Sequence, residues 1–300
     1  QRYVHAVDGV SFSMSQGEIL GLVGESGSGK TTTALNVLGL LEPTSGDVLF
    51  GGESVPQLAG GRRRMHLRRS MQIIFQDPYE ALNPRQTVFE IVGEPLDIHR
   101  MAGSRAEKTR LVAEALSAAG LKPPETFFNR FPQELSGGQR QRAVIAGALV
   151  LNPDMLVADE PVSMLDVSIR AEILNLLRDL RDERGITILY ITHDLATAAY
   201  FTDRVVVLYL GRIMEIGPTP VVLREPQHPY TRALLSVIPV PNPRNRRKRM
   251  ILEGETPNPV DLPSGCRFHP RCPIASEMCQ VSEPELRLVN SGQRVACLKV

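Results

Sequence analysis

Residues 24 to 31 read Gly-Glu-Ser-Gly-Ser-Gly-Lys-Thr and fit the phosphate-loop pattern G-x-x-x-x-G-K-T. The apolar run Ile19 to Val23 before it reads as a buried strand, and Thr31 to Leu40 reads as a helix. Glycines here let successive backbone N–H groups converge on a phosphate, and the positive end of the following helix adds a favourable field. The motif therefore predicts nucleotide binding, with Lys30 on the β- and γ-phosphates and the Thr31 hydroxyl on Mg²⁺. The residues expected at the nucleotide are Gly24, Glu25, Ser26, Gly27, Ser28, Gly29, Lys30, Thr31 and Thr32.

Strand-like and helix-like stretches alternate over most of the chain. Short apolar runs read as buried strands, and longer stretches with apolar residues three or four positions apart read as helices. This alternation predicts an α/β fold with a parallel sheet and a ligand at the carboxyl ends of its strands. Strands are expected at Val7 to Met14, Ile19 to Val23, Asp47 to Phe50, Met71 to Phe75, Met155 to Ala158, Ile186 to Ile191 and Val205 to Leu210. Helices are expected at Thr31 to Leu40, Ser104 to Ala119, Arg140 to Leu149, Ser168 to Arg184 and Gln227 to Ser236.

Composition narrows the class of protein. Hydrophobic residues at 42% and charged residues at 22% are ordinary for a soluble globular chain, and no run approaches the ~18 apolar residues of a membrane-spanning helix. A net charge of +1 argues against a generally nucleic-acid-binding surface. Any membrane role is therefore expected to depend on a partner. A strand pattern begins almost directly after Gln1, so we expect further sequence upstream.

Two further elements carry chemistry. Asp159 and Glu160 follow the apolar run from Met155, where two adjacent carboxylates are costly unless cations or ligands pair them. Beside a Mg²⁺-nucleotide, Asp159 would organise the metal through water and Glu160 would polarise the attacking water as general base. The second element is Leu135-Ser136-Gly137-Gly138-Gln139, where small residues and a hydroxyl open a helix and suit a second anion contact.

In their order along the chain, these elements resemble the ATPase subunits of ATP-binding cassette (ABC) transporters. The resemblance covers residues from about 7 to 237. It implies that each chain supplies half of a site, so that ATP meets the signature of a second ABC ATPase subunit only when two cassettes close. The implied elements are the signature Leu135, Ser136, Gly137, Gly138 and Gln139, the Q-loop Gln76, which also reaches Mg²⁺, the D-loop with Ser163 and Asp166, the switch histidine His193 in the catalytic site, and an aromatic for adenine at Tyr3.

Four longer stretches resemble the oligopeptide/dipeptide importer branch, and within it the second ATPase of oligopeptide permeases. They are Phe75 to Pro78, Leu82 to Arg85, His228 to Leu234, and the tail ending Cys297-Leu298-Lys299-Val300. The resemblance implies peptide import with two transmembrane permease subunits and an extracytoplasmic peptide-binding protein. It places the chain peripherally at the cytoplasmic face of the inner membrane. Two alternatives are an importer ATPase for another small solute such as a nickel chelate, and a soluble ABC protein that works on ribosomes or nucleic acid.

The composition suggests two domains. Residues 1–238 are expected to be the ATPase domain, with a helical subdomain inserted at about 77–151, and residues 239–300 a linker, Pro239 to Arg249, followed by a small C-terminal module. All of the cysteines fall in that module, at Cys266, Cys272, Cys279 and Cys297.

Four thiols in a loop-rich module suggest a cross-link that replaces a core. Disulfides are disfavoured in a reducing cytosol, and structural zinc usually binds close C-x₂₋₄-C pairs that the spacing C-x5-C-x6-C-x17-C lacks. A [4Fe–4S] cluster accepts four thiolates with longer loops, and the tail resembles that of peptide-importer ATPases that carry one. We therefore expect a structural iron–sulfur cluster, with zinc and disulfides as the alternatives.

Overall fold

The computed structural model describes residues 2–61, 63–238, 250–290 and 292–300. The linker expected at residues 239–249 lies outside the described residues. The chain divides into two compact units. The first unit comprises residues 1–14, 19–33 and 190–300, and the second unit comprises residues 15–18 and 34–189.

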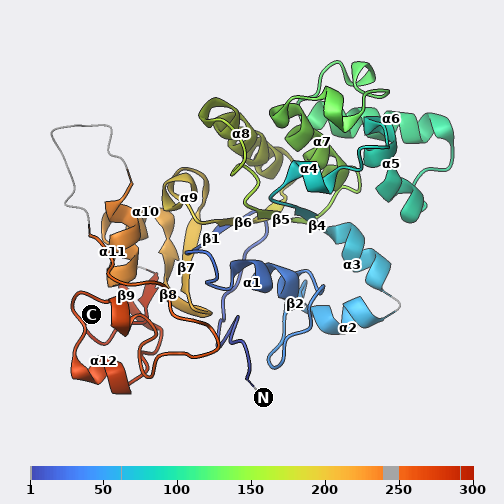
Figure 1. Ribbon diagram of the computed structural model, residues 1–300. Helices are drawn as coiled ribbons and strands as arrows, with labels where there is room; N and C mark the ends of the chain where they lie inside the picture. The colour runs from blue at the N-terminus through green and yellow to red at the C-terminus, as the bar shows by residue number, and fades with distance from the viewer. Residues whose placement is uncertain (1, 62, 239–249, 291) are drawn as a thin grey trace. The chain divides into compact units, whose positions relative to one another are not determined.

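The sheet of the first unit begins with β1 (Ile19–Val23), whose five residues are all buried. β1 pairs in parallel with β7 (Arg204–Tyr209), with Leu20 opposite Arg204. β7 turns into the antiparallel β8 (Arg212–Pro218) through Leu210 and Gly211, both with positive φ, as a two-residue hairpin requires. The hairpin is visible in Figure 1 as two adjoining arrows.

The C-terminal residues extend this same sheet. β10 (Gln293–Val295) pairs antiparallel with β8, and β9 (Arg287–Asn290) pairs with β10. The helices and the 3₁₀ turn that lie wholly in the described part of the first unit are short. They are α9 (Leu195–Phe201), α10 (Thr219–Arg224), α11 (Pro229–Ser236), the 3₁₀ turn η3 (His269–Arg271) and α12 (Glu277–Val281).

The core of the first unit joins the sheet to the chain after residue 249, here called the C-terminal segment (residues 250–300). Tyr209 of β7, Tyr230 of α11 and Phe268 are fully buried. Their ring centroids lie 4.9 to 5.3 Å apart. Tyr209 meets both other rings in the edge-to-face arrangement that aromatic rings favour, and the Tyr230 and Phe268 rings are tilted at 54° to each other. Cys266 and Cys279 are buried in the same cluster. Because Phe268 is part of this core, the C-terminal segment does not depend on a cross-link alone for its packing.

The second unit contains a helical part and the parallel pair β4 (Met71–Ile74) and β5 (Met155–Asp159), with Met71 opposite Met155. β6 (Thr187–Thr192) begins in the second unit and ends in the first. A small ribbon pairs β2 (Leu49–Phe50) with β3 (Glu53–Ser54).

Most helices lie wholly in the second unit, and those between residues 78 and 149 fall inside the range expected for the helical subdomain. Ser104 accepts a hydrogen bond from the Glu107 amide and caps α6 (Arg105–Ala118) as expected, and α8 (Val167–Arg184) buries Ile173, Leu177 and Leu180. The helices and 3₁₀ turns are α2 (Val55–Gly60), α3 (Arg64–Ser70), α4 (Pro78–Ala81), α5 (Val88–Ile98), α6 (Arg105–Ala118), η1 (Pro124–Thr126), η2 (Pro132–Glu134), α7 (Gly137–Leu149) and α8 (Val167–Arg184).

The strand expected at Val7 to Met14 is wrong. Gly9 has a φ of 62°, which bends the chain out of an extended path. The segment instead makes isolated contacts: the Asp8 amide donates to the Gly211 carbonyl, and the Ser13 carbonyl accepts from the Arg204 guanidinium.

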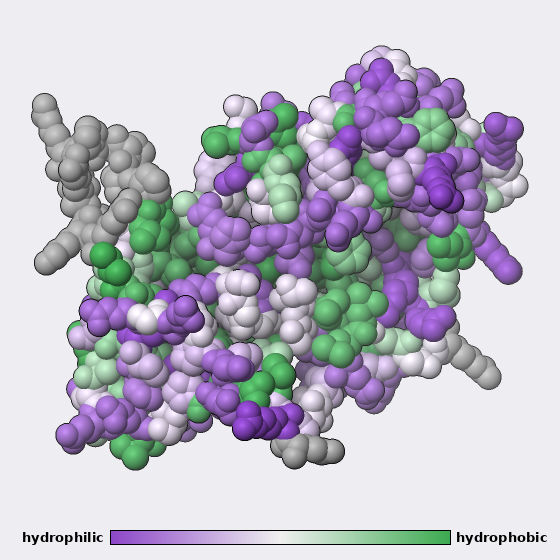
Figure 2. Space-filling model, in the orientation of Figure 1, coloured by the Kyte–Doolittle hydropathy of each residue, from purple (hydrophilic) through white to green (hydrophobic). Residues whose placement is uncertain are grey.

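No helix formed by the described residues is long and apolar enough to cross a membrane. On the face shown in Figure 2, hydrophobic residues form scattered patches between hydrophilic ones. Scattered exposed apolar side chains are ordinary on a protein surface.

A buried polar cluster fixes the start of α11. The His228 imidazole, 1% exposed, accepts from the Tyr230 amide at 3.0 Å and caps the helix. The His228 amide donates to the Glu215 carboxylate of β8 at 3.0 Å, and Gln293 of β10 donates to the same carboxylate at 2.6 Å. Burial lowers the pKa of His228 to about 3, and burial raises the pKa of Glu215.

We predict that His228 makes the fold acid-sensitive. The unfolded imidazole binds a proton below pH 6.5 whereas the folded one does not until about pH 3, so its contribution to stability is lost as the pH falls through this window. The stability of the wild type relative to His228→Asn, which keeps a capping side chain, should decrease by about 2 kcal/mol between pH 7 and pH 5. Urea unfolding followed by circular dichroism measures this difference. Glu215 is present in both proteins, so its opposite titration cancels, and a difference independent of pH would contradict the prediction.

Candidate nucleotide-binding site

The phosphate loop follows β1 and leads into α1 (Lys30–Val37). Gly27 and Gly29 have φ values of 76° and 102°, which L-residues rarely adopt. A Cβ on Gly24 would overlap the Leu208 carbonyl oxygen, and one on Gly29 would overlap the Ala6 carbonyl oxygen. The glycines of the motif are therefore required both by backbone angle and by close packing against neighbouring backbone.

Lys30 lies within the loop. It is 7% exposed, and its ammonium donates to the Gly24 carbonyl at 2.8 Å and to the Glu25 carbonyl at 2.9 Å. The Ser28 amide bonds to the Glu25 carbonyl at 3.2 Å, and the Ser28 hydroxyl is buried without a hydrogen-bond partner among the described residues. A buried, unpartnered hydroxyl beside a buried ammonium suits a polyanionic ligand such as a nucleotide phosphate. Thr31 is exposed and Thr32 half-buried.

The acidic end of β5 lies in the second unit. Asp159 is the last strand residue, and Glu160 adopts a φ of 47°, a sparsely populated conformation for a non-glycine residue. The Ser163 amide and hydroxyl both donate to the Glu160 carbonyl, at 3.2 and 3.0 Å, and hold this turn. The Gln76 side chain donates to the Glu160 carboxylate at 3.3 Å. The structure thus brings together the expected Q-loop glutamine, the expected base and the D-loop serine.

The signature segment opens α7. Ser136 caps the helix: its hydroxyl accepts from the Gln139 amide at 3.3 Å, and the Gln139 side chain accepts from the Ser136 amide at 3.0 Å. A Cβ on Gly138 would lie 2.8 Å from the Ile169 side chain, so α7 and α8 approach closely here. Asp166 of the D-loop is the residue before α8. The expectation that this segment starts a helix is confirmed.

The remaining sequence-predicted residues are more exposed. His193 is an exposed residue between β6 and α9, next to Asp194, whose carboxylate caps α9 by accepting from the Ala196 amide at 2.8 Å. Tyr3, the expected adenine contact, is 66% exposed. The roles of both residues stay predictions.

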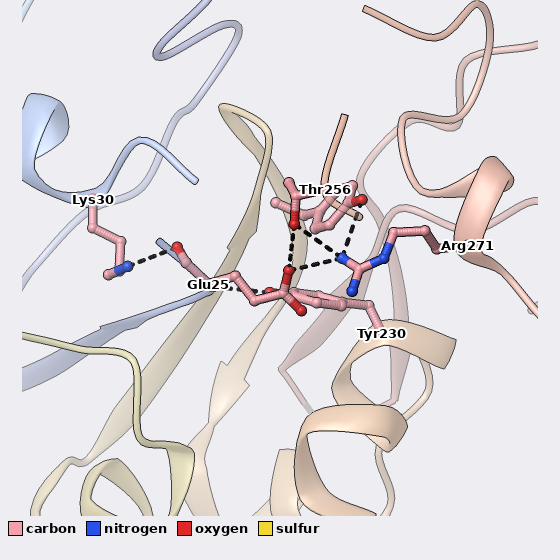
Figure 3. A network of polar contacts seen from close by, with 6 residues as sticks. Glu25, Lys30, Tyr230, Thr256 and Arg271 are labelled. Carbon is pink, nitrogen blue, oxygen red and sulfur yellow. Dashed lines mark hydrogen bonds and ion pairs between the residues drawn. The ribbon is translucent and has the colours of Figure 1, made fainter. Parts of the chain in front are cut away.

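One part of the site was missed from the sequence. Glu25, an unspecified position of the motif, is contacted by Tyr230, Thr256 and Arg271, which lie more than 200 residues away. Figure 3 shows these side chains converging on Glu25, with Lys30 on the opposite side of Glu25 from Arg271. The sequence held one sign of this contact: Glu25 places an acidic side chain beside the expected phosphate, where a cation is needed to balance its charge.

The four cysteines are all free thiols. Cys266, Cys279 and Cys297 are buried and Cys272 is half-buried. Burial, with smaller contributions from the other three cysteines, raises the pKa of Cys266 to about 11. The thiols therefore influence one another, but no group of three or more His, Cys, Asp or Glu side chains in the described part of the chain could hold a metal ion. As they lie here, the cysteines do not fit an iron–sulfur cluster or zinc.

The fold and the phosphate loop define a nucleotide-binding protein with an α/β fold. Residues 7–163 match the family described as ABC transporter, and residues 214–279 match a second family, described as oligopeptide/dipeptide transporter, C-terminal region. The chain belongs to the ABC transporter family, and its activity is ATP hydrolysis.

Relatives match nearly the whole chain. A putative peptide import ATP-binding protein of Brucella ovis is 53% identical, covering 98% of this chain and 91% of its own length. The oligopeptide transport ATP-binding protein AppF of Bacillus subtilis is 46% identical, and the match covers 98% of this chain and 89% of AppF.

Solved structures are similar in fold. CbiO1 from Clostridium perfringens, part of the ABC transporter complex cbiONQ, has a TM-score of 0.66 and 33% identity, covering 73% of this chain and 84% of that one. The ATP-binding cassette MJ0796, as a post-hydrolysis dimer bound to ADP and Pi, has a TM-score of 0.64 and 33% identity. The match covers 71% of this chain and 90% of the MJ0796 chain.

We predict unequal effects of alanine at two loop glycines. Gly29→Ala adds a Cβ that collides with backbone, so the loop must move and Mg-ADP binding should be lost. Gly27→Ala meets nothing within 4 Å and costs only the left-handed conformation, on the order of 1–2 kcal/mol. Calorimetric titration with Mg-ADP compares the two variants, with urea unfolding as the check on folding. Equal binding by both variants would show that the close packing at Gly29 is not required.

Proposed function

We propose that this chain is the ATP-hydrolysing subunit of an importer for oligopeptides or dipeptides. The observation that carries the proposal is that a phosphate-loop cassette and an oligopeptide/dipeptide-transporter C-terminal region occur in one chain. The names of the Brucella and Bacillus relatives support the substrate class. Import of another small solute, such as a nickel chelate, is the alternative that shares the same ATPase chemistry.

The proposed chemistry assigns one role to each group. Lys30 binds the β- and γ-phosphates. Thr31 and Gln76 coordinate Mg²⁺, and Asp159 binds it through a water molecule. Glu160 accepts a proton from the attacking water. At the same time the water oxygen bonds to the γ-phosphorus, and the bond from that phosphorus to the β-γ bridging oxygen breaks. The strained turn at Glu160 and its hydrogen bond from Gln76 support a defined orientation of this carboxylate.

The proposed working unit is larger than one chain. His193 would contact the γ-phosphate, and Ser136 and Gly138 would act on ATP bound to a second ABC ATPase subunit. Two transmembrane permease subunits would carry the solute, delivered by an extracytoplasmic peptide-binding protein. The chain would then lie peripherally at the cytoplasmic face of the inner membrane, with the C-terminal module of residues 239–300 attached to the ATPase domain of residues 1–238.

We predict that ATP-driven peptide uptake depends on Glu160. Loss of a general base typically slows a reaction on the order of 10²–10⁴-fold, so Glu160→Gln should nearly abolish hydrolysis while Mg-ATP still binds. The measurement is uptake of labelled di- and oligopeptides into vesicles that contain the assembled transporter, together with phosphate release.

Glu172→Gln is the matched control, because Glu172 is an exposed carboxylate of α8 that pairs with Arg142 and has no role in the proposed chemistry. Wild-type turnover by the Glu160 variant would refute the base assignment. ATP-driven uptake of a nickel chelate, with none of peptides, would refute the substrate class and leave the ATPase assignment intact.

The cofactor of the cysteine segment is a separate proposal. The residue types and the resemblance favour a [4Fe–4S] cluster, with zinc or disulfides as alternatives, although the thiols would have to rearrange to hold it. Anaerobically purified protein should then contain about four irons and four acid-labile sulfides per chain. Stoichiometric zinc, or titration of four free thiols in metal-free folded protein, would contradict the cluster.

A further inference from the structure

Glu25 connects the phosphate loop to the C-terminal segment. Its carboxylate accepts from the Arg271 guanidinium and from the Thr256 hydroxyl, each at 2.7 Å. Nη1 of Arg271 also lies 3.2 Å from the Thr256 hydroxyl and 3.5 Å from the Tyr209 hydroxyl. One nitrogen of Arg271 therefore contacts one carboxylate and two hydroxyls (Figure 3).

The backbone of Glu25 is held as well. Its amide donates to the Tyr230 hydroxyl at 3.0 Å, and its carbonyl accepts from the Lys30 ammonium at 2.9 Å. Tyr230 is fully buried against Tyr209 and Phe268, so its hydroxyl has a fixed position. A shift of Glu25 would consequently displace a carbonyl that orients Lys30.

The charge of Glu25 makes this contact important for nucleotide binding. A carboxylate in the phosphate loop repels the nucleotide phosphates unless a cation neutralises it. The Arg271 side chain is 10% exposed and that of Glu25 29% exposed, so water screens this pair less than it would an ion pair on the surface. Arg271 also lies on the Tyr209 ring, with its guanidinium carbon 5.9 Å from the ring centroid, which restricts its position.

We propose that Arg271 is a positioning residue for nucleotide binding, which neutralises Glu25 and fixes it in the phosphate loop. The C-terminal segment thereby forms part of the support of the ATP site. This inference rests on the proposed function only in requiring that the loop binds nucleotide. It does not depend on the transported solute or on any metal.

The test is calorimetric titration of full-length protein with Mg-ADP. Arg271→Gln leaves the Glu25 carboxylate without its cation, and its Kd should rise at least about tenfold. Glu25→Gln combined with Arg271→Gln removes the carboxylate too, so the double variant should recover to within about threefold of the wild type. Arg271→Lys places one ammonium where one guanidinium nitrogen made the contacts, and it should likewise stay within about threefold.

Arg287→Gln is the matched control in the same segment. Arg287 donates to the Cys297 carbonyl at 2.9 Å and to the Val300 carbonyl, and neither residue is in the phosphate loop. Its Kd for Mg-ADP should remain that of the wild type.

Two results would overturn the proposal. One is unchanged binding by Arg271→Gln, and the other is a double variant that binds as weakly as Arg271→Gln, because that would indicate loss of folding rather than of charge balance. Failure of the wild type itself to bind Mg-ADP would instead refute the proposed ATPase function, and this inference with it.

Discussion

The phosphate loop depends on backbone that is packed too closely for any side chain. Leu208 and Ala6 place their carbonyl oxygens where a Cβ of Gly24 or Gly29 would lie. Both neighbours lie at the β7–β8 hairpin: Leu208 is within β7, and the Ala6 carbonyl oxygen lies 2.9 Å from where a Cβ of Gly211 would be. The Gly211 amide also donates to the Ser28 carbonyl of the loop at 2.9 Å. The conformation that lets N–H groups converge on a phosphate is therefore set by the sheet around the loop as much as by the glycines.

The C-terminal segment adds to this support. It contributes Phe268 to the aromatic core, β10 to the edge of the sheet at β8, and Arg271 to Glu25. These three contacts are of different kinds, apolar burial, backbone pairing and charge, and all involve the unit that carries the phosphate loop. The segment is consequently better described as part of the nucleotide-binding unit than as an appendage.

Sequence patterns predicted the buried strands because strands covered on both faces are continuous apolar runs, as in β1 and β5. They missed β8, because Glu215, Gly217 and Pro218 interrupt the apolar run by which a buried strand is recognised. The Glu215 carboxylate is nevertheless buried, in a hydrogen-bonded cluster. They also missed β9 and β10, which are short and polar.

Among the site residues, the phosphate loop and the signature could be located because each is a local motif at the start of a helix. The contact between Glu25 and Arg271 could not, since it joins residues 246 positions apart and leaves no local pattern. The iron–sulfur hypothesis followed from the number and spacing of the thiols and from the resemblance of the tail, and none of these could show how the four thiols are placed. The unpredicted features are thus those that arise from long-range packing.

Hydrogen exchange measured on the full-length protein, with and without Mg-ADP, tests most directly whether the C-terminal segment supports the ATP site. If it does, nucleotide binding should slow exchange both in residues 24–31 and in residues 256–272, because the two are joined through Glu25. Slower exchange confined to the phosphate loop, with residues 256–272 unchanged, would contradict this account.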